Sequence, residues 1–202
     1  MGLIYRSFAA LENIARNTLK NFDKTLLSGP PKAVPIEKLA EHLGLFVEIQ
    51  CIRKCGQILG EMIFEKSLVP IYCRDFNKYT LIEVDAKTII LDDSLLGDKN
   101  EGRMRFTCAH EIAHWILHKD MYLGTGQAAA LGHPKKSSEI DSALESQANT
   151  LATFLLMPRP QIKQAFYKIQ GNSRINPIIT LAELFNVSKQ AMEICLSDRN
   201  LI

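Results

Sequence analysis

The sequence has few cysteines, and their arrangement predicts neither a structural metal site nor a disulfide framework. Five cysteines are scattered over 202 residues, and Cys51 and Cys55 have no second pair that would complete a zinc ribbon. An odd, widely spaced set of thiols is typical of a protein in a reducing compartment. We therefore expect a cytoplasmic protein with reduced thiols.

Charge of one sign and long apolar runs are lacking as well. The formal net charge is only +2, which argues against strong attraction to nucleic acid or to an anionic membrane surface. No apolar run approaches the length of a membrane span, and the N-terminus lacks the pattern of a signal peptide. A hydrophobic content of 47% and a charged content of 23% instead predict a globular protein with a sizeable core.

The stretch 103–118 carries the clearest chemical signal, because it contains an H-E-x-x-H motif at residues 110–114. On a helix, His110 and His114 lie one turn apart on nearly the same face, so both imidazoles can reach one metal ion. Glu111 is rotated by roughly 100° from His110, where it can hold a water molecule without binding the metal. This spacing is typical of a zinc hydrolase, which needs two such ligands, an open coordination position and a nearby base.

The helix around the motif is largely apolar, which favours a buried position for the two histidines. Its apolar residues are Phe106, Ala109, Ala113, Trp115, Ile116 and Leu117. The alternative is a pair of hydrogen-bonded core histidines with a chance glutamate between them. A second acidic residue farther along the chain argues against that alternative.

This residue is Glu145, in a helix predicted to begin after an N-cap at Ser138 and to end at Met157 before two prolines. Glu145 lies at the edge of the helix's apolar stripe, beside small residues, where an unpaired carboxylate would be costly to bury. A metal held by the two histidines would pair with it. We therefore predict Glu145 as the third ligand, in preference to Glu139 or Asp141 at the start of the helix. Without the upstream motif, it would read as a surface glutamate.

Another histidine, His118, follows His114 by one turn. Because the rise of the helix carries it away from a metal centred between His110 and His114, we expect hydrogen bonding rather than ligation. A metzincin site is excluded, since Leu117 and Asp120 occupy the positions where that arrangement needs glycine and histidine.

The segment 119–137 holds three glycines, a proline and few apolar anchors, so we predict a mobile loop near the mouth of the cleft. Tyr122 and His133 are both candidates to stabilise an oxyanion, and the sequence does not choose between them.

The remaining pattern predicts an α+β fold, with a small sheet packed against the metal-binding helix and the helix that carries Glu145. Asn100 is the expected N-cap of the former. Further helices are expected at 3–22, 36–43, 161–170, 179–185 and 188–196. Strands are expected at 45–49, 57–64, 68–73, 79–84 and 87–92. We assign residues 1–160 to a zincin-like domain and 161–202 to a helical tail with helix-turn-helix cadence, packed on the same unit rather than reading DNA.

Two blocks of the sequence together resemble the ImmA/IrrE-type metallopeptidases. The first runs from Arg105 to His118. The second, 145–158, is similar to the family pattern E-x-x-A-N-x-x-A-x-x-L-L-M-P and places Glu145 at the metal-ligand position. Cys108 and Cys195 depart from the residues expected at their positions, without touching the metal chemistry. The resemblance implies a cytosolic zinc protease that cuts a regulatory protein, typically a helix-turn-helix repressor of a mobile element or stress response that is encoded nearby.

We therefore expect a Zn²⁺ ion bound by His110, His114 and Glu145, with Glu111 as general base and Asn149 as one candidate to orient an imidazole. The alternative is a non-catalytic regulator with a structural metal, which binds the repressor or DNA and needs a fourth ligand from Cys108 or His118. Since no specificity pocket is evident, we expect the loop 119–137 and the tail to dock a folded partner.

Overall fold

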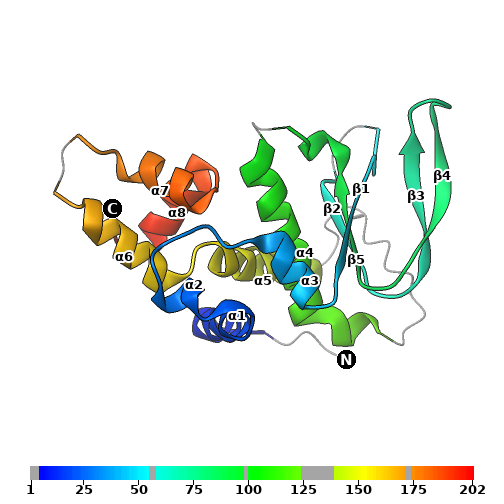
Figure 1. The fold of residues 1–202 in the computed structure, drawn as a ribbon. Helices are drawn as coiled ribbons and strands as arrows, with labels where there is room; N and C mark the ends of the chain where they lie inside the picture. Colours follow the sequence, from blue (N-terminus) through cyan, green and yellow to red (C-terminus); the bar gives the residue numbers. More distant parts are fainter. Residues whose placement is uncertain (1–4, 55–57, 98–99, 124–138, 172–173) are drawn as a thin grey trace.

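Two central helices lie between a small sheet on one side and the tail helices on the other (Figure 1). The computed structural model describes residues 5–54, 58–97, 100–123, 139–171 and 174–202 of the chain. The central helices are α4 (Glu101–Tyr122) and α5 (Glu139–Leu156), and they pack directly against each other. The α+β class predicted from the sequence is confirmed, with a zincin-like domain and C-terminal helices.

A three-stranded sheet covers one side of α4. Its strands are β1 (Phe46–Gln50), β5 (Thr88–Asp92) and β2 (Gly60–Ile63), in the order β1-β5-β2. The central strand β5 runs parallel to β1 and antiparallel to β2, and all five of its residues are buried. Both β2 and β5 contact α4. The central strand β5 therefore contains the continuous apolar run Ile89-Ile90-Leu91, as expected for a strand that is buried along its whole length.

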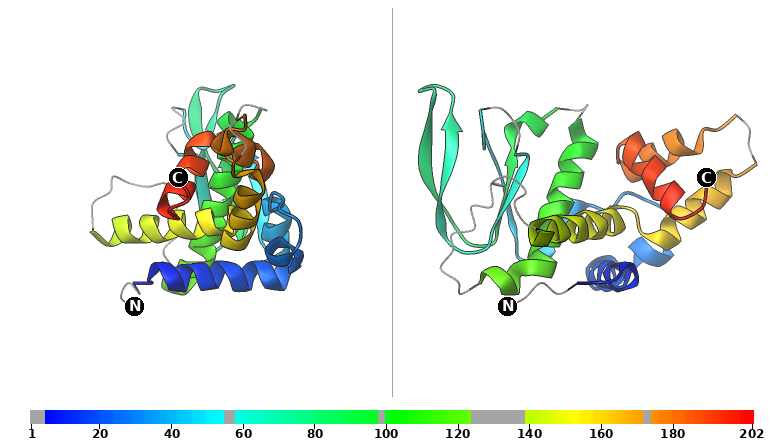
Figure 2. Two further views of the ribbon diagram at one scale, coloured as in Figure 1. Left: turned by 90° about the vertical axis from the view of Figure 1, so that its left-hand side faces the viewer. Right: turned by 180° about the vertical axis from the view of Figure 1, so that it is seen from behind.

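The other two strands form a hairpin of their own, so the single small sheet expected from the sequence is wrong in this respect. In the hairpin, β3 (Ser67–Cys73) pairs antiparallel with β4 (Lys78–Val84). One face packs Val69 and Val84 into a second small core with Ile63 and Ile90 of the three-stranded sheet. The hairpin therefore lies over the face of that sheet instead of extending its edge, as the views in Figures 1 and 2 show.

The remaining helices lie in the N-terminal part of the chain, just before α4 and in the tail. They are α1 (Phe8–Asp23), α2 (Thr25–Ser28), α3 (Ile36–His42), the 3-10 helix η1 (Asp93–Leu95), α6 (Arg159–Ile169), α7 (Pro177–Phe185) and α8 (Lys189–Asp198). Gly44, with a φ of 72°, follows α3 in the left-handed conformation that glycine adopts at little cost. Among the described helices, none combines the length and apolar character needed to span a bilayer.

Several predicted helix ends differ from the observed ones. The first helix begins at Phe8 rather than at residue 3, and residues 1–4 lie outside the described part of the chain. Asn100 does precede α4, but its side chain donates to the Ser94 carbonyl and does not cap the helix. Ser138 and the loop beyond Leu123 lie outside the described residues, so those predictions stay untested.

One continuous hydrophobic core joins elements from α1 to α8, and two arginines add polar connections to the tail. The Arg105 guanidinium donates from Nη2 to the Val34 carbonyl (2.7 Å) and from Nε to the Asn186 carbonyl (3.0 Å). Arg199 donates to the Met157 carbonyl (2.8 Å). Figure 2 shows the tail helices gathered at the end of α5. The boundary at residue 160 stays a prediction.

The double contact of Arg105 predicts a measurable contribution to stability. Arg105→Ala should lower the free energy of unfolding by about 3 kcal/mol, because two charge-assisted hydrogen bonds are lost and two carbonyls lose their donor. Arg105→Lys should recover only part of this free energy, since an ammonium group lacks the planar fork that reaches both carbonyls. Urea unfolding measures the effect, with Lys20→Ala in α1 as the exposed-cation control. An Arg105→Ala protein as stable as the wild type would contradict this role.

Candidate metal centre

Three potential metal donors meet where α4 packs on α5. His110 and His114 project from successive turns of α4, and their Nε2 atoms are 2.9 Å apart. Glu145 of α5 faces both, with carboxylate oxygens 3.3 Å from His110 Nε2 and 3.3 Å from His114 Nε2. The structure thus brings together the three residues that the sequence predicts as ligands, and Asp141 does not belong to this group.

The electrostatics of the group favour a charged carboxylate. Burial by itself would raise the pKa of Glu145, but hydrogen bonds and charge from His110 and His114 hold it well below its ordinary value. Burial lowers the pKa of His110, and Glu145 and Glu111 reverse this effect, so its net shift is upward. An anion facing two imidazoles attracts cationic charge, whether a proton or a metal ion.

The opposite ring nitrogens of the two histidines also have partners. His110 Nδ1 donates to Asn149 Oδ1 (3.0 Å), the contact for which the sequence made Asn149 a candidate. His114 Nδ1 lies 3.1 Å from His118 Nδ1. These contacts leave both Nε2 atoms facing Glu145, which is the orientation that metal-binding imidazoles need.

His118 completes this arrangement as a hydrogen-bond acceptor. Burial, followed by the neighbouring His114, lowers the pKa of His118 to about 3, so its ring is neutral near pH 7. A neutral His118 can accept a hydrogen bond from the N–H at His114 Nδ1, and in that tautomer His114 Nε2 carries the lone pair that a metal needs. His118 itself does not belong to the group of close donors.

The donor set fits a zinc ion. Zinc–nitrogen bonds are about 2.0–2.1 Å, so two ligands at the tetrahedral angle lie roughly 3.3 Å apart. The separations of 2.9 and 3.3 Å around His110, His114 and Glu145 are close to this value. Two neutral imidazoles and one carboxylate are also ligands that zinc prefers.

Glu111 lies beside this group, buried between α4 and strand β2. At Gly60 of β2, a Cβ atom would stand 2.9 Å from Glu111 Oε1 and 2.6 Å from Thr107 Cγ2. Glycine at this position therefore lets the strand lie directly against the Glu111 carboxylate. Gly60 is not among the site residues predicted from the sequence, although an isolated glycine in an apolar strand is a signal of close backbone approach.

The other residues considered from the sequence take different positions. Tyr122 stacks on Phe64 with ring centroids 4.7 Å apart, and burial followed by Asp141 and Glu145 raises its pKa. Cys108 is buried in the core and does not belong to the donor group. His133 lies outside the described residues, so the choice of an oxyanion-stabilising residue stays open.

A second set of potential donors, Cys51, Asp92 and Asp93, lies at the ends of β1 and β5. Its carboxylates already have protein partners. Asp92 accepts from the Ile52 and Ser94 backbone N–H groups (2.8 and 3.1 Å), and Asp93 pairs with Arg74 (2.7 Å). These contacts connect the strand ends and explain the cluster without a metal.

Comparison with protein families assigns the part of the chain that carries His110, His114 and Glu145 to a known type of domain. The model of the IrrE N-terminal-like domain (Peptidase_M78) matches residues 70–197, which include both blocks that carry the donors. The chain belongs to this family. The IrrE N-terminal-like assignment confirms the resemblance found in the sequence and supports a metallopeptidase-type function, which implies a protein substrate. A search among curated proteins finds no match.

The contact between His114 and His118 predicts an effect on metal affinity. His118→Leu should weaken zinc binding about 10–100-fold, because His114 loses the acceptor that orients its ring. His118→Gln should recover part of the affinity, since its amide oxygen can accept the same hydrogen bond from His114. Competition with a chromophoric chelator measures the affinity.

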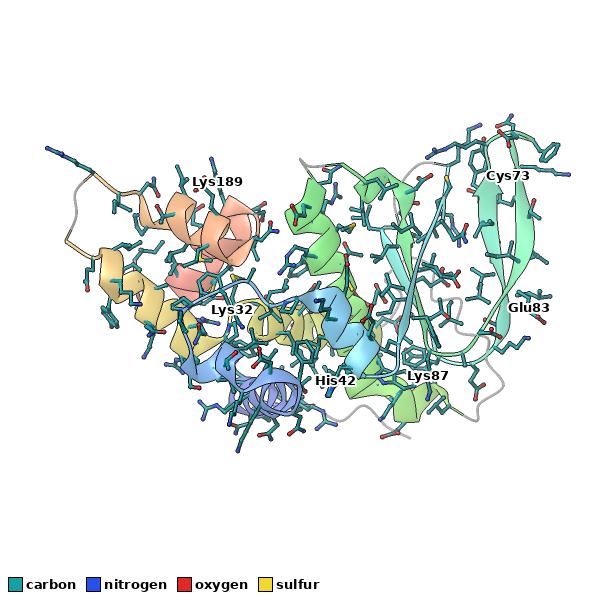
Figure 3. The ribbon with its side chains drawn as sticks, in the orientation of Figure 1. Lys32, His42, Cys73, Glu83, Lys87 and Lys189 are labelled. Carbon is teal, nitrogen blue, oxygen red and sulfur yellow. The ribbon has the colours of Figure 1, made fainter. Side chains whose placement is uncertain are left out.

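A matched control is His42→Leu. The ring of His42 in α3, labelled in Figure 3, lies 5.3 Å from that of Phe22 at a tilt of 54°, and His42 does not belong to the donor group. Zinc affinity that is equal in the wild type and His118→Leu would contradict the orienting role.

Proposed function

We propose that this protein is a zinc-dependent endopeptidase that uses His110, His114 and Glu145 as metal ligands and Glu111 as general base. The single observation that carries the proposal is the meeting of two imidazoles and one carboxylate within 3.3 Å, with a buried glutamate on the same turn of α4. Membership of a peptidase family agrees with this chemistry.

Each side chain has a defined task in this proposal. A bound zinc ion would polarise the peptide carbonyl and make water more acidic. His110, His114 and Glu145 would hold that ion, and Asn149 would fix the ring of His110. Glu111 would accept a proton from the attacking water and deliver it to the departing amide nitrogen. The packing of Glu111 against Gly60 of β2 supports this role, because it holds the carboxylate in a restricted position next to His110 on α4.

The alternative of a non-catalytic regulator requires a fourth protein ligand that closes the metal site. Among the residues that the structure describes, the donor group contains three members, and neither Cys108 nor His118 belongs to it. This composition favours a site with an open coordination position, as hydrolysis requires.

We further propose that the substrate is a helix-turn-helix repressor encoded nearby. This assignment rests on the resemblance to ImmA/IrrE-type peptidases. A cut between the DNA-binding and oligomerising parts of such a repressor would uncouple its two half-site contacts and lower its affinity for DNA.

The metal assignment predicts about one zinc ion per chain in the purified protein. His110→Ala, His114→Ala and Glu145→Ala should each lower zinc occupancy sharply, because each removes one of three protein ligands. Metal content is measured by atomic spectroscopy after gel filtration. Asp141→Asn in α5 is the matched control, since Asp141 does not belong to the donor group. Full zinc occupancy in Glu145→Ala would show that the third ligand is a different residue.

The catalytic assignment predicts that Glu111→Gln keeps its zinc and its fold but loses activity. The amide cannot accept the proton from water, and general-base catalysis contributes on the order of 10²–10⁴ in rate. Co-expression with the neighbouring repressor, followed by mass spectrometry, should show one cleavage that Glu111→Gln abolishes and Glu41→Gln does not. Wild-type turnover by Glu111→Gln would remove this mechanism, and repressor released from DNA while still intact would favour the regulator.

A further inference from the structure

A groove of about 660 Å³ lies between the start of α4, the middle of α5 and helix α8. Its volume falls within the range of about 300–1,000 Å³ that is usual for ligand-binding pockets. Asn149 lines the groove and also accepts the hydrogen bond from His110. The groove therefore begins beside the candidate metal centre.

The same faces of α4 and α5 line both the groove and the metal centre. On α4, Arg103 and Phe106 precede His110 by seven and four residues, so the three side chains share one helix face. On α5, Thr153 follows Asn149 by one turn and lines the groove with it. A polypeptide segment lying along these faces would lead directly from the groove to the donor group.

The walls of the groove are largely apolar. Phe106 of α4 and Phe154 of α5 line one part, and Ala191 and Ile194 of α8 line another. Ile194 is 53% exposed although it faces this groove. Exposed apolar side chains gathered in a concave surface are typical of a binding site.

Two arginines add positive charge to the groove. The Nη1 atom of Arg199 is buried and has no hydrogen-bond partner among the described residues, while its Nη2 donates to the Met157 carbonyl (2.8 Å). Arg103 forms no salt bridge within the described part of the chain. Asp198 also lines the groove, so its lining carries two cations and one anion. Two guanidinium groups against one carboxylate leave the lining with an excess of positive charge, which favours a ligand that supplies a carboxylate.

We propose that this groove binds a segment of the substrate protein next to the cleaved bond, through an apolar side chain and an acidic one. The apolar side chain would lie against Phe106 and Ile194, and the carboxylate would face Arg103 and Arg199. This inference rests on the proposed peptidase function and adds a sequence preference to it. It also gives α8, in the tail, a direct part in substrate selection.

The first experiment measures binding without cleavage. Zinc-loaded Glu111→Gln protein is tested against an array of short synthetic peptides in which apolar and charged residues vary independently. Peptides that combine a large apolar residue with Asp or Glu should bind best. Adding Arg103→Glu should weaken the binding of acidic peptides on the order of tenfold, because the charge at the groove is reversed. It should strengthen the binding of the matching peptides in which lysine replaces the acidic residue. Ile194→Asp should weaken the binding of peptides with a large apolar residue by a similar factor.

A matched control is Lys189→Glu, a charge reversal at the exposed start of α8 outside the lining of the groove (Figure 3). It should leave the peptide preference unchanged. The zinc content of every variant is measured first, so that loss of the metal is not mistaken for loss of the groove. Ile194 is half-exposed, so its substitution leaves the core intact.

The second experiment follows cleavage of the same peptides by the protein with Glu111 intact, and it separates the two proposals. Selective binding without cleavage would support the groove and overturn the proposed hydrolysis. Cleavage at sites that do not change with Arg103→Glu or Ile194→Asp would support the peptidase and overturn the groove. The groove would also be overturned if octanoate bound there while no peptide did, since the site would then hold a small carboxylate.

Discussion

The close packing of α4 against α5 is the constraint on which the candidate metal centre depends. His110 and His114 belong to one helix and Glu145 to the other, so their 3.3 Å contacts exist only while the two backbones stay close. The small residues beside these donors are fully buried: Ala109, Ala113, Ala148 and Ala152. Short side chains at a helix interface permit such an approach, because larger ones would force the axes apart. A polar site of three residues is thus built into the hydrophobic core.

The sheet packs against this helix pair on one side, and the tail helices pack against it on the other. Strand β2 lies against Glu111, where Gly60 has no side chain to keep it away. The tail is joined to α4 through Arg105, which donates to the turn before α8. The same helix therefore carries the proposed base on its sheet side and one wall of the groove on its tail side. Strand β2 would thus help to position the base and α8 would help to recognise the substrate, while α4 and α5 line both parts.

Hydrogen bonds behind the histidines extend the site beyond its four principal residues. Asn149 accepts from His110, and His118 faces His114, so both rings are held from the side opposite Glu145. Because Asn149 also lines the groove, a substrate bound there would touch a residue that orients a proposed ligand. In this proposal, substrate binding and metal geometry would be coupled through the side chain of Asn149.

Much of the local structure could be predicted from the sequence, because helix periodicity and short motifs depend on residues near one another. The spacing of His110, Glu111 and His114 determines their directions on α4, and the second motif pointed to Glu145. The tertiary structure alone decided that His118 faces His114, that Gly60 lies on Glu111 and that the strands form two sheets. Pairing of strands and contacts between distant segments depend on how whole faces pack, and the sequence pattern of a single segment does not contain that information.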